Sequence, residues 1–197
     1  MEGEHKKFDF DSIQPGYCFK PHDWELIMFY LEKKAKNECL PPNLMHETNI
    51  YQFDPETLTE RYRAQGDGEW YFFSSRDKRY KNGKRPNRAA GDGHWKATGI
   101  KNINYNGTII GYKRTLVFYQ GNRSSAQKTN WLMYEYTLPN SAPTMGSGMK
   151  LDDHVLCKIY KNVTNGRQDN ADQSHSLANY QQNEDPIVIN SLKKCIK

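Results

Sequence analysis

The most chemically distinctive part of this chain is the stretch of residues 76–101, which mixes basic, aromatic and small side chains. It holds nine Lys and Arg residues against two Asp residues, a net charge of +7. The rest of the 197-residue chain carries 19 basic and 21 acidic groups, so its net charge is −2. A single cationic region on an otherwise slightly acidic chain is the pattern expected of a protein that binds a polyanion such as nucleic acid.

Within this stretch, residues 94–99 are predicted to form a strand. One face of that strand carries His94, Lys96 and Thr98, and the other carries Trp95, Ala97 and Gly99. Trp and Ala suit a protein core, whereas Lys and Thr suit a DNA major groove, where guanine acceptors and thymine methyl groups are exposed. Arg85 and Arg88 lie just upstream and can add base and phosphate contacts. The alternative is a surface strand whose Lys and Thr face water, and the residue chemistry alone does not separate the two.

The elements before this stretch are predicted to be mainly helical. From Asp23 onward, apolar residues recur at helical spacing, and the segment is expected to stop at residues 40–43 (Leu-Pro-Pro-Asn). Residues 49–53 are interpreted as a strand. Asp54 and Pro55 then open a short helix, as an N-cap and a first-turn proline.

The remaining elements are predicted strands. Residues 69–73 carry aromatic side chains on both faces, which indicates a strand covered on both sides. Asn106 and Gly107 between two apolar runs are a strong signal for a two-residue hairpin turn. Residues 113–119, 130–137 and 155–160 complete the set. The predicted fold is therefore α+β, a twisted, mostly antiparallel sheet flanked by a few helices.

Composition divides the chain into three parts. Residues 1–13 are expected to be a flexible polar arm, residues 14–162 a globular domain, and residues 163–197 a disordered polar tail that cannot bury enough apolar surface to fold. Residues 144–150 read as a loop. The mean hydropathy of −0.96 and the lack of a long apolar run argue against a membrane partner. The first seven residues do not resemble a secretion signal, so we expect the chain to stay inside the cell.

Other chemistry is weakly supported. In the cluster of His22, Asp23 and Glu25, Asp23 is better explained as a helix-start residue. His154 and Cys157 would lie on opposite faces of one strand. Neither set forms a catalytic motif, so no enzymatic activity, cofactor or metal is expected. The four cysteines, Cys18, Cys39, Cys157 and Cys195, are too widely spaced for a zinc pattern and are expected to be free thiols. The tryptophans at 70, 95 and 131 are expected to pack in the core rather than to stack on bases.

Several blocks, in order, resemble the plant NAC-domain transcription factors. They are Pro15-Gly16-Tyr17 with Glu25-Leu26, then residues 69–73, 76–80, 85–91 and 95–99, then 111–119 and 128–131 with Glu135-Tyr136, and finally Asp152-Asp153 with 155–161. Together they span roughly residues 14 to 162. The resemblance implies a nuclear regulator that inserts the Trp-Lys-Ala-Thr-Gly strand into the major groove of double-stranded DNA, at sites with a CGT-type core, without a cofactor.

Residue roles follow from the same resemblance. Base-facing positions would be Arg88, Lys96 and Thr98, and backbone-facing positions would be Arg76, Arg79 and Arg85. His94 stands where the family usually has Tyr and can still donate to a phosphate or base. Where the family often has phosphate-contacting lysines, this chain has Asn122 and Ser125, for which Arg123 and Lys128 compensate in part.

The resemblance also implies pairing with a second NAC-type chain, as a homodimer or heterodimer, through residues that include Pro15, Gly16, Cys18 and Glu25. Cys18 replaces an Arg that in the family pairs with a Glu across the dimer, so dimerisation would rest on other contacts or be weaker. These departures motivate an alternative function. In it, the chain is a protein-interaction module with weakened DNA binding that modulates other NAC proteins by dimerising with them.

Overall fold

A computed structural model describes residues 19–65, 68–80, 85–122, 124–139 and 150–162. Helical elements come first: α1 (Asp23–Glu25), η2 (Leu26–Leu31), α2 (Glu32–Ala35), η3 (Ile50–Gln52) and α3 (Pro55–Arg61). The strands are β1 (His46–Glu47), β2 (Glu69–Asp77), β3 (Ala89–Ala90), β4 (Gly93–Tyr105), β5 (Thr108–Gln120), β6 (Gln127–Thr137) and β7 (Lys150–Lys161). The expected arm at 1–13, residues 144–149 of the expected loop and the tail at 163–197 lie outside the described residues. Lys150, predicted as the last residue of that loop, is instead the first residue of β7.

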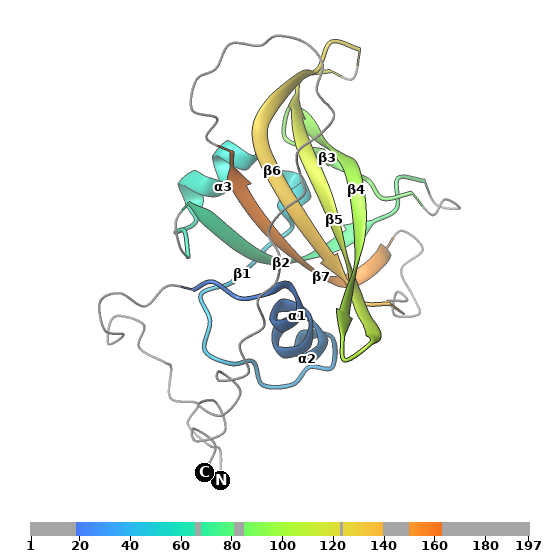
Figure 1. The fold of residues 1–197 in the computed structure, drawn as a ribbon. Helices are drawn as coiled ribbons and strands as arrows, with labels where there is room; N and C mark the ends of the chain where they lie inside the picture. Colours follow the sequence, from blue (N-terminus) through green and yellow to red (C-terminus); the bar gives the residue numbers. More distant parts are fainter. Residues whose placement is uncertain (1–18, 66–67, 81–84, 123, 140–149, 163–197) are drawn as a thin grey trace. The chain divides into compact units, whose positions relative to one another are not determined.

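These strands form one curled sheet in the order β1-β2-β7-β6-β5-β4-β3 (Figure 1). The β1–β2 pair is parallel, and the other neighbouring pairs are antiparallel. The predicted α+β fold with a mostly antiparallel sheet is therefore confirmed. The three strands predicted after the hairpin signal are also present, each longer than its predicted range.

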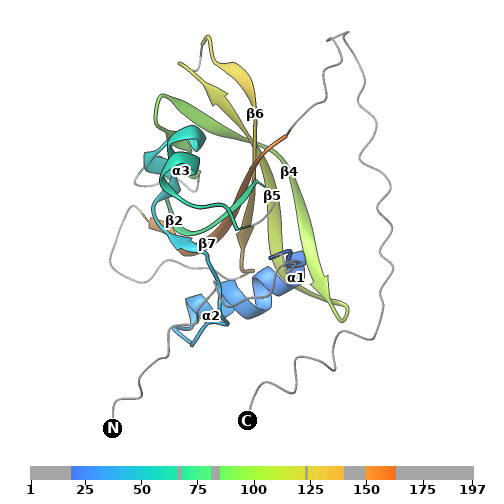
Figure 2. The same ribbon diagram turned by 90° about the vertical axis from the view of Figure 1, so that its left-hand side faces the viewer.

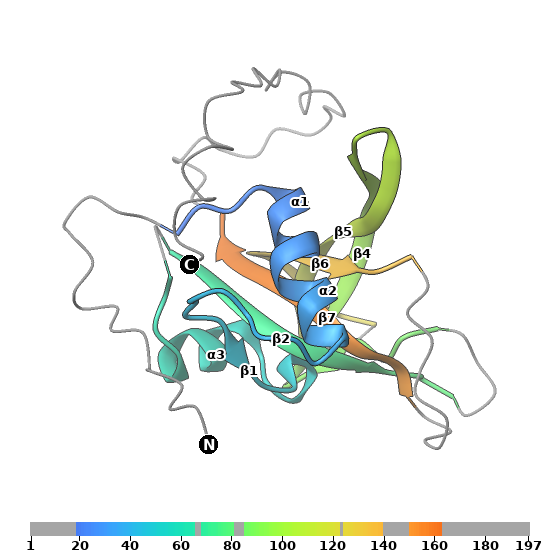
Figure 3. The ribbon, with the colours of Figure 1, turned by 90° about the horizontal axis from the view of Figure 1, so that it is seen from below.

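Apolar side chains cover both faces of the sheet. On one face, Leu26, Ile27 and Leu31 of η2 pack with Tyr71 and Phe73 of β2. On the other face, Ile50 of η3 and Leu58 of α3 pack with Phe72, Trp95 and Trp131. Figures 2 and 3 show α1–α2 and α3 on opposite sides of β2 and β7. The prediction that residues 69–73 are buried from both sides is confirmed, because both layers meet at β2.

The N-terminal helix begins where the sequence predicts but ends earlier. Its middle part is a π-helix, and Asn37 terminates it in the left-handed region at φ 54°. The amides of Asn37 and Glu38 donate to the carbonyls of Lys34 and Lys33, which is a Schellman termination. The expected stop at residues 40–43 is therefore a few residues late, because the amides of Asn37 and Glu38 already satisfy the last helix carbonyls.

Residues 49–53 correct a second prediction. They form the short 3-10 helix η3 instead of a strand, because the Asn49 side chain accepts a hydrogen bond from the Tyr51 amide at 3.1 Å and folds the chain back. The helix predicted to start at Asp54 is confirmed as α3. Its N-cap carboxylate accepts from the Thr57 amide at 2.8 Å, and Pro55 occupies the first turn.

The β4–β5 hairpin is the longest pairing in the described sheet. Its turn is the predicted one: Asn106 and Gly107 have φ values of 49° and 77°, as a type I′ turn requires. Near the turn, the Tyr105 ring lies 5.0 Å from the ring of Trp24 in α1. Among the described helices, none is long and apolar enough to cross a membrane.

Candidate nucleic-acid interface

The predicted strand at residues 94–99 is the first half of β4, and it is anchored on one side only. Trp95 is 2% exposed and packs on Phe118, with ring centres 5.2 Å apart. From Lys96 to Lys101 every residue is exposed. The two-residue β3 pairs with β4 only at Gly93 and His94. Beyond that point, the described residues place no strand on the outer edge of β4, so this edge is open.

A β-bulge interrupts the predicted alternation. Lys96 pairs with Val117 of β5, and the next residue paired on the same face is Gly99, opposite Thr115. Thr98 is the extra residue of the bulge, and its hydroxyl donates to the Thr115 carbonyl at 3.3 Å. The prediction that Gly99 shares a face with Trp95 is therefore wrong, because the bulge moves Gly99 to the face of Lys96. The core position expected for Ala97 is also wrong, because Ala97 is exposed.

Three sequence-predicted residues gather around Tyr119 of β5. His94 and Lys128 are its cross-strand partners on either side. The His94 and Tyr119 rings stack, with centres 5.8 Å apart and planes 23° apart. The Lys96 ammonium lies 5.4 Å from the centre of the same ring. The sheet thus assembles a small cluster of cationic and aromatic groups from three strands, with Lys96 and Lys128 both exposed.

Arg79 and Arg85 are brought together by backbone pairing at the end of β2. The Arg79 amide donates to the Arg85 carbonyl at 2.8 Å, and the Asn87 amide donates to the Asp77 carbonyl at the same distance. Arg85 is exposed, and the Arg79 guanidinium lies 5.3 Å from the ring centre of its neighbour Tyr80. This pairing holds two cations of the basic segment at one side of the sheet.

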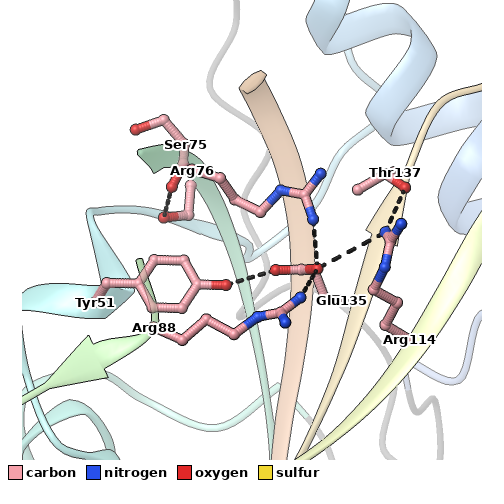
Figure 4. A network of polar contacts seen from close by, with 8 residues as sticks. Tyr51, Ser75, Arg76, Arg88, Arg114, Glu135 and Thr137 are labelled. Atoms are coloured by element: carbon pink, nitrogen blue, oxygen red, sulfur yellow. Dashed lines mark hydrogen bonds and ion pairs between the residues drawn. The ribbon is translucent and has the colours of Figure 1, made fainter. Parts of the chain in front are cut away.

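Arg76 and Arg88 point inward, to a buried carboxylate. Glu135 of β6 is fully buried, and its Oε1 accepts from Arg76 at 2.8 Å and from Arg88 at 3.1 Å (Figure 4). Its Oε2 accepts from the Tyr51 hydroxyl at 2.5 Å, and Arg114 stands 3.9 Å from Oε1. These five residues, Tyr51, Arg76, Arg88, Arg114 and Glu135, are called the Glu135 cluster below.

The electrostatics of the Glu135 cluster keep its carboxylate ionised. Burial alone would raise the pKa of Glu135, but the charges of Arg76, Arg88 and Arg114 and the Tyr51 hydrogen bond outweigh burial and lower it. Burial and the nearby carboxylate raise the pKa of Tyr51 well above its ordinary value, so this phenol remains a neutral donor. Three guanidinium groups thus surround the Glu135 carboxylate, at 2.8, 3.1 and 3.9 Å.

Sequence reasoning did not assign a role to Glu135, Tyr51, Arg114 or Tyr119. A signal for Glu135 was present: Trp131, Met133 and Glu135 alternate along one face of β6, and the first two are core residues. An acid in the register of a buried face needs cationic partners. The spacing of residues along the sequence does not show which cations pair with Glu135, because Arg76 lies 59 residues away in the chain.

Comparison with known proteins decides the family. A family model described as "No apical meristem (NAM) protein" matches residues 14–138. The chain belongs to the NAC (NAM) family. It is 48% identical to NAC domain-containing protein 2 of Solanum lycopersicum over 155 residues, which cover 77% of this chain and 56% of the relative. It is 47% identical to NAC domain-containing protein 55 of Arabidopsis thaliana over 158 residues, covering 80% and 49%.

A third NAC relative aligns over more of its length. NAC transcription factor 29 of Arabidopsis thaliana is 40% identical over 187 residues, which cover 93% of this chain and 69% of the relative. The chain spans about half the length of the first two relatives. The fold described above is therefore that of a NAC domain.

Some predicted site residues of this NAC domain lie outside the described residues, namely Arg123, Pro15, Gly16 and Cys18. Glu25 is described: its carboxylate accepts from the His22 amide at 2.7 Å and caps α1. Asp23 is the first residue of α1, which confirms its prediction as a helix-start residue. Asp23 is held by Tyr136 at 2.6 Å and by Lys113 at 2.9 Å.

The three strand tryptophans pack inside the NAC domain, as predicted. Trp95 and Trp131 are buried, and Trp70 packs against the same core. The Trp131 indole donates to the Glu56 carboxylate, and the Trp70 indole donates to the Tyr62 carbonyl at 2.9 Å. Cys157 is a fully buried free thiol whose pKa is raised by burial and by Glu135.

Proposed function

We propose that this chain is a sequence-specific regulator of transcription that binds double-stranded DNA in the nucleus. It inserts the His94–Gly99 part of β4 into the major groove, at sites with a CGT-type core. The observation that carries the proposal is that β4 is anchored to the core at one residue and exposed along the residues that follow. Trp95 fixes the strand to the core, while the next six residues and one edge are exposed beside the most cationic part of the chain.

The contacts divide by position. Lys96, at the start of the exposed run, is the principal base contact because an ammonium can donate to guanine O6 and N7. His94 and Thr98, on either side of it, reach base edges or neighbouring phosphates. Arg79, Arg85 and Lys128 lie at the margins and neutralise phosphates, a role that the family resemblance also gives to Arg123. Such contacts supply affinity that is independent of sequence and sensitive to salt.

Arg76 and Arg88 differ from the other cations because Glu135 holds both. The Arg76 side chain is only 7% exposed, so its task is to fix the base of the cationic segment and not to touch the DNA backbone directly. The Arg88 side chain is 17% exposed, with one nitrogen bound to Glu135. It contacts bases from a fixed orientation, and Glu135 acts as a positioning residue behind it.

Pairing with a second NAC-type chain is part of the proposal. Two copies would present two β4 strands and so read two half-sites, as dimeric DNA-binding proteins commonly do. Glu25 belongs to this surface by family resemblance, although its carboxylate also caps α1. Sedimentation velocity over a range of protein concentrations tests the pairing. A single species of one-chain mass at every concentration contradicts it.

Three variants test the division of contacts on a CGT-core duplex and on a scrambled duplex of equal length. Lys96→Ala is expected to weaken core binding by about 1–3 kcal/mol while changing scrambled binding far less. Arg85→Ala is expected to weaken both duplexes alike and to reduce the salt slope by about one unit. Lys36→Ala removes one charge from the exposed end of the N-terminal helix and is the charge-matched control. Equal losses for Lys96→Ala on both duplexes would contradict base contact by this residue.

A further inference from the structure

We propose that Ile100 is a second base-contacting residue, which recognises the 5-methyl group of a pyrimidine in the major groove. The inference rests on the proposed function and deepens it. Thymine carries this methyl group naturally, and cytosine carries it when methylated. The inference therefore adds a purely aliphatic side chain to the contacts expected from Lys96 and Thr98.

The exposure of Ile100 is the first observation. Its side chain is 60% exposed, whereas Ile103, on the same strand, is 5% exposed and belongs to the core under α1–η2. Leaving a large aliphatic side chain in water forgoes the free energy that its burial would give. Ile100 also lies inside the exposed run that follows Trp95, on the open edge of β4. Its position thus coincides with the surface proposed to enter DNA.

The bulge at Thr98 sets the side on which Ile100 lies. Ile100 pairs with Arg114, and Arg114 pairs with Glu135, so these three residues form one row on the face that carries Trp95. Lys96 pairs with Val117 and lies on the opposite face. Without the extra residue, Ile100 would follow Lys96 on the same face. The bulge therefore gives the two sides of the inserted strand different chemistry, a cation on one and an aliphatic group on the other.

Arg114, the cross-strand partner of Ile100, contacts two residues of the next strand. Arg114 donates to the Thr137 hydroxyl at 3.2 Å and stands 3.9 Å from the Glu135 carboxylate, and both partners are on β6. The Arg114 guanidinium therefore has two partners on β6, which lies on the opposite side of β5 from Ile100.

The chemistry of the major groove identifies the partner. Base edges there present donors and acceptors, and the apolar group among them is the C5-methyl of thymine. The isoleucine side chain has neither a hydrogen-bond donor nor an acceptor. Among the groups on the base edges, only this methyl group therefore gains free energy from contact with it. Four residues of strand extend about 13 Å, and base pairs stack about 3.4 Å apart. The methyl group should therefore lie within about four base pairs of the base that Lys96 contacts.

The test uses a duplex in which a CGT core is flanked on each side by four A·T pairs, so that every flanking pair supplies one thymine. Each thymine, including the one in the core, is replaced in turn by deoxyuridine, which lacks only the methyl group. One replacement is expected to weaken binding of the unaltered chain about fourfold, the equivalent of one buried methylene-sized group. The same replacement should leave binding by Ile100→Ala unchanged.

A second arm distinguishes the two sources of the methyl group. If the contacted base is the core cytosine, no deoxyuridine replacement has an effect. Instead, 5-methylation of that cytosine strengthens binding of the unaltered chain about fourfold and does not affect Ile100→Ala. Either pattern supports the inference. Ile109→Ala is the matched control, because Ile109 is 43% exposed at the far end of the hairpin. It should respond to every methyl change as the unaltered chain does.

The inference is overturned if the unaltered chain and Ile100→Ala respond equally to every methyl group while both still prefer the CGT core. In that case the proposed function stands and only the role of Ile100 is lost. If neither protein distinguishes the core from a scrambled duplex, the proposed function itself has failed and the inference fails with it.

Discussion

Arg76 and Glu135 form an ion pair of 2.8 Å in which neither side chain is more than 7% exposed. They come from β2 and β6, which flank β7 in the sheet. Arg76 opens the cationic segment in the sequence, yet its charge is used inside the fold. A buried carboxylate therefore anchors the start of the segment, whereas Arg85, Lys96 and Lys101 of the same segment are exposed.

Glu135→Gln tests how much this buried carboxylate stabilises the domain. The amide keeps the shape of the side chain but removes the negative charge that Arg76, Arg88 and Arg114 face. We expect the free energy of unfolding to fall by about 3–5 kcal/mol, the usual cost of removing one partner from a buried ion pair. Urea unfolding followed by tryptophan fluorescence measures it.

The matched control for this experiment is Glu32→Gln. Glu32 pairs with Lys36 on the solvent-exposed surface of the N-terminal helix. Exposed pairs of this kind contribute little, so no measurable loss of stability is expected. Similar losses in the two variants would contradict the structural importance of the Glu135 cluster.

The lowered pKa of Glu135 predicts how stability depends on pH. The folded-state pKa lies below the unfolded-state value of about 4.3, so the ionised carboxylate stabilises the fold above that pH. This contribution is lost as the pH falls below about 4.3 and through the folded-state pKa. We expect the stability difference between the unaltered chain and Glu135→Gln to be constant from pH 5 to pH 7 and to shrink at lower pH. A difference that does not change down to pH 3 would contradict this.

Tyr51→Phe isolates the hydrogen bond on the second carboxylate oxygen. The ring is retained, but Glu135 loses the hydroxyl donor at 2.5 Å. Hydrogen bonds to charged groups contribute about 1.5–3 kcal/mol, so a loss in this range is expected in urea unfolding. Tyr80→Phe, at a tyrosine that is 62% exposed, should have no effect. If both variants retain full stability, Tyr51 does not support the cluster.

Substitutions at two glycines of β4 can separate effects on folding stability from effects on DNA binding. A Cβ at Gly93 would overlap the Tyr119 carbonyl and the Phe118 ring, whereas a Cβ at Gly99 meets nothing within 4 Å. Gly93→Ala should therefore destabilise the fold, by about 1–3 kcal/mol for an overpacked site. Gly99→Ala should leave stability unchanged or slightly raised.

The same glycine pair tests the proposed insertion of β4. If the strand backbone approaches DNA closely, Gly99→Ala weakens duplex binding although the domain remains stable. Fluorescence anisotropy with a labelled CGT-core duplex measures this. Undiminished affinity in Gly99→Ala would mean that the backbone at this position does not approach the DNA.

The sheet and its hairpin could be predicted from sequence because their signals are local. The two residues Asn106-Gly107 are enough to specify the hairpin turn. The aromatic side chains at residues 69–73 indicate a strand that is buried on both faces. The termination at Asn37 and the 3-10 turn at Asn49 were missed. In both cases a single asparagine changes the direction of the backbone, and the spacing of apolar residues along the sequence gives no sign of that change.

The site was predicted less completely, for a physical reason. Alternation along residues 94–99 assumes uninterrupted pairing, and the bulge at Thr98 depends on the register with β5, which the strand's own sequence does not fix. Likewise, the sequence of the basic segment shows its net charge, but it does not show which of its charged side chains form ion pairs inside the fold. The inward role of Arg76 depends on Glu135, an acid far away in the sequence.

The central claim is that the exposed part of β4 recognises DNA sequence. The most direct measurement is the affinity of the purified chain for a CGT-core duplex and for a scrambled duplex across a salt series. The account predicts a preference for the core of about 10³-fold or more, which persists at near-physiological salt while both affinities fall with salt. Steep salt dependence with no preference between the duplexes would contradict the account and would favour the protein-interaction alternative.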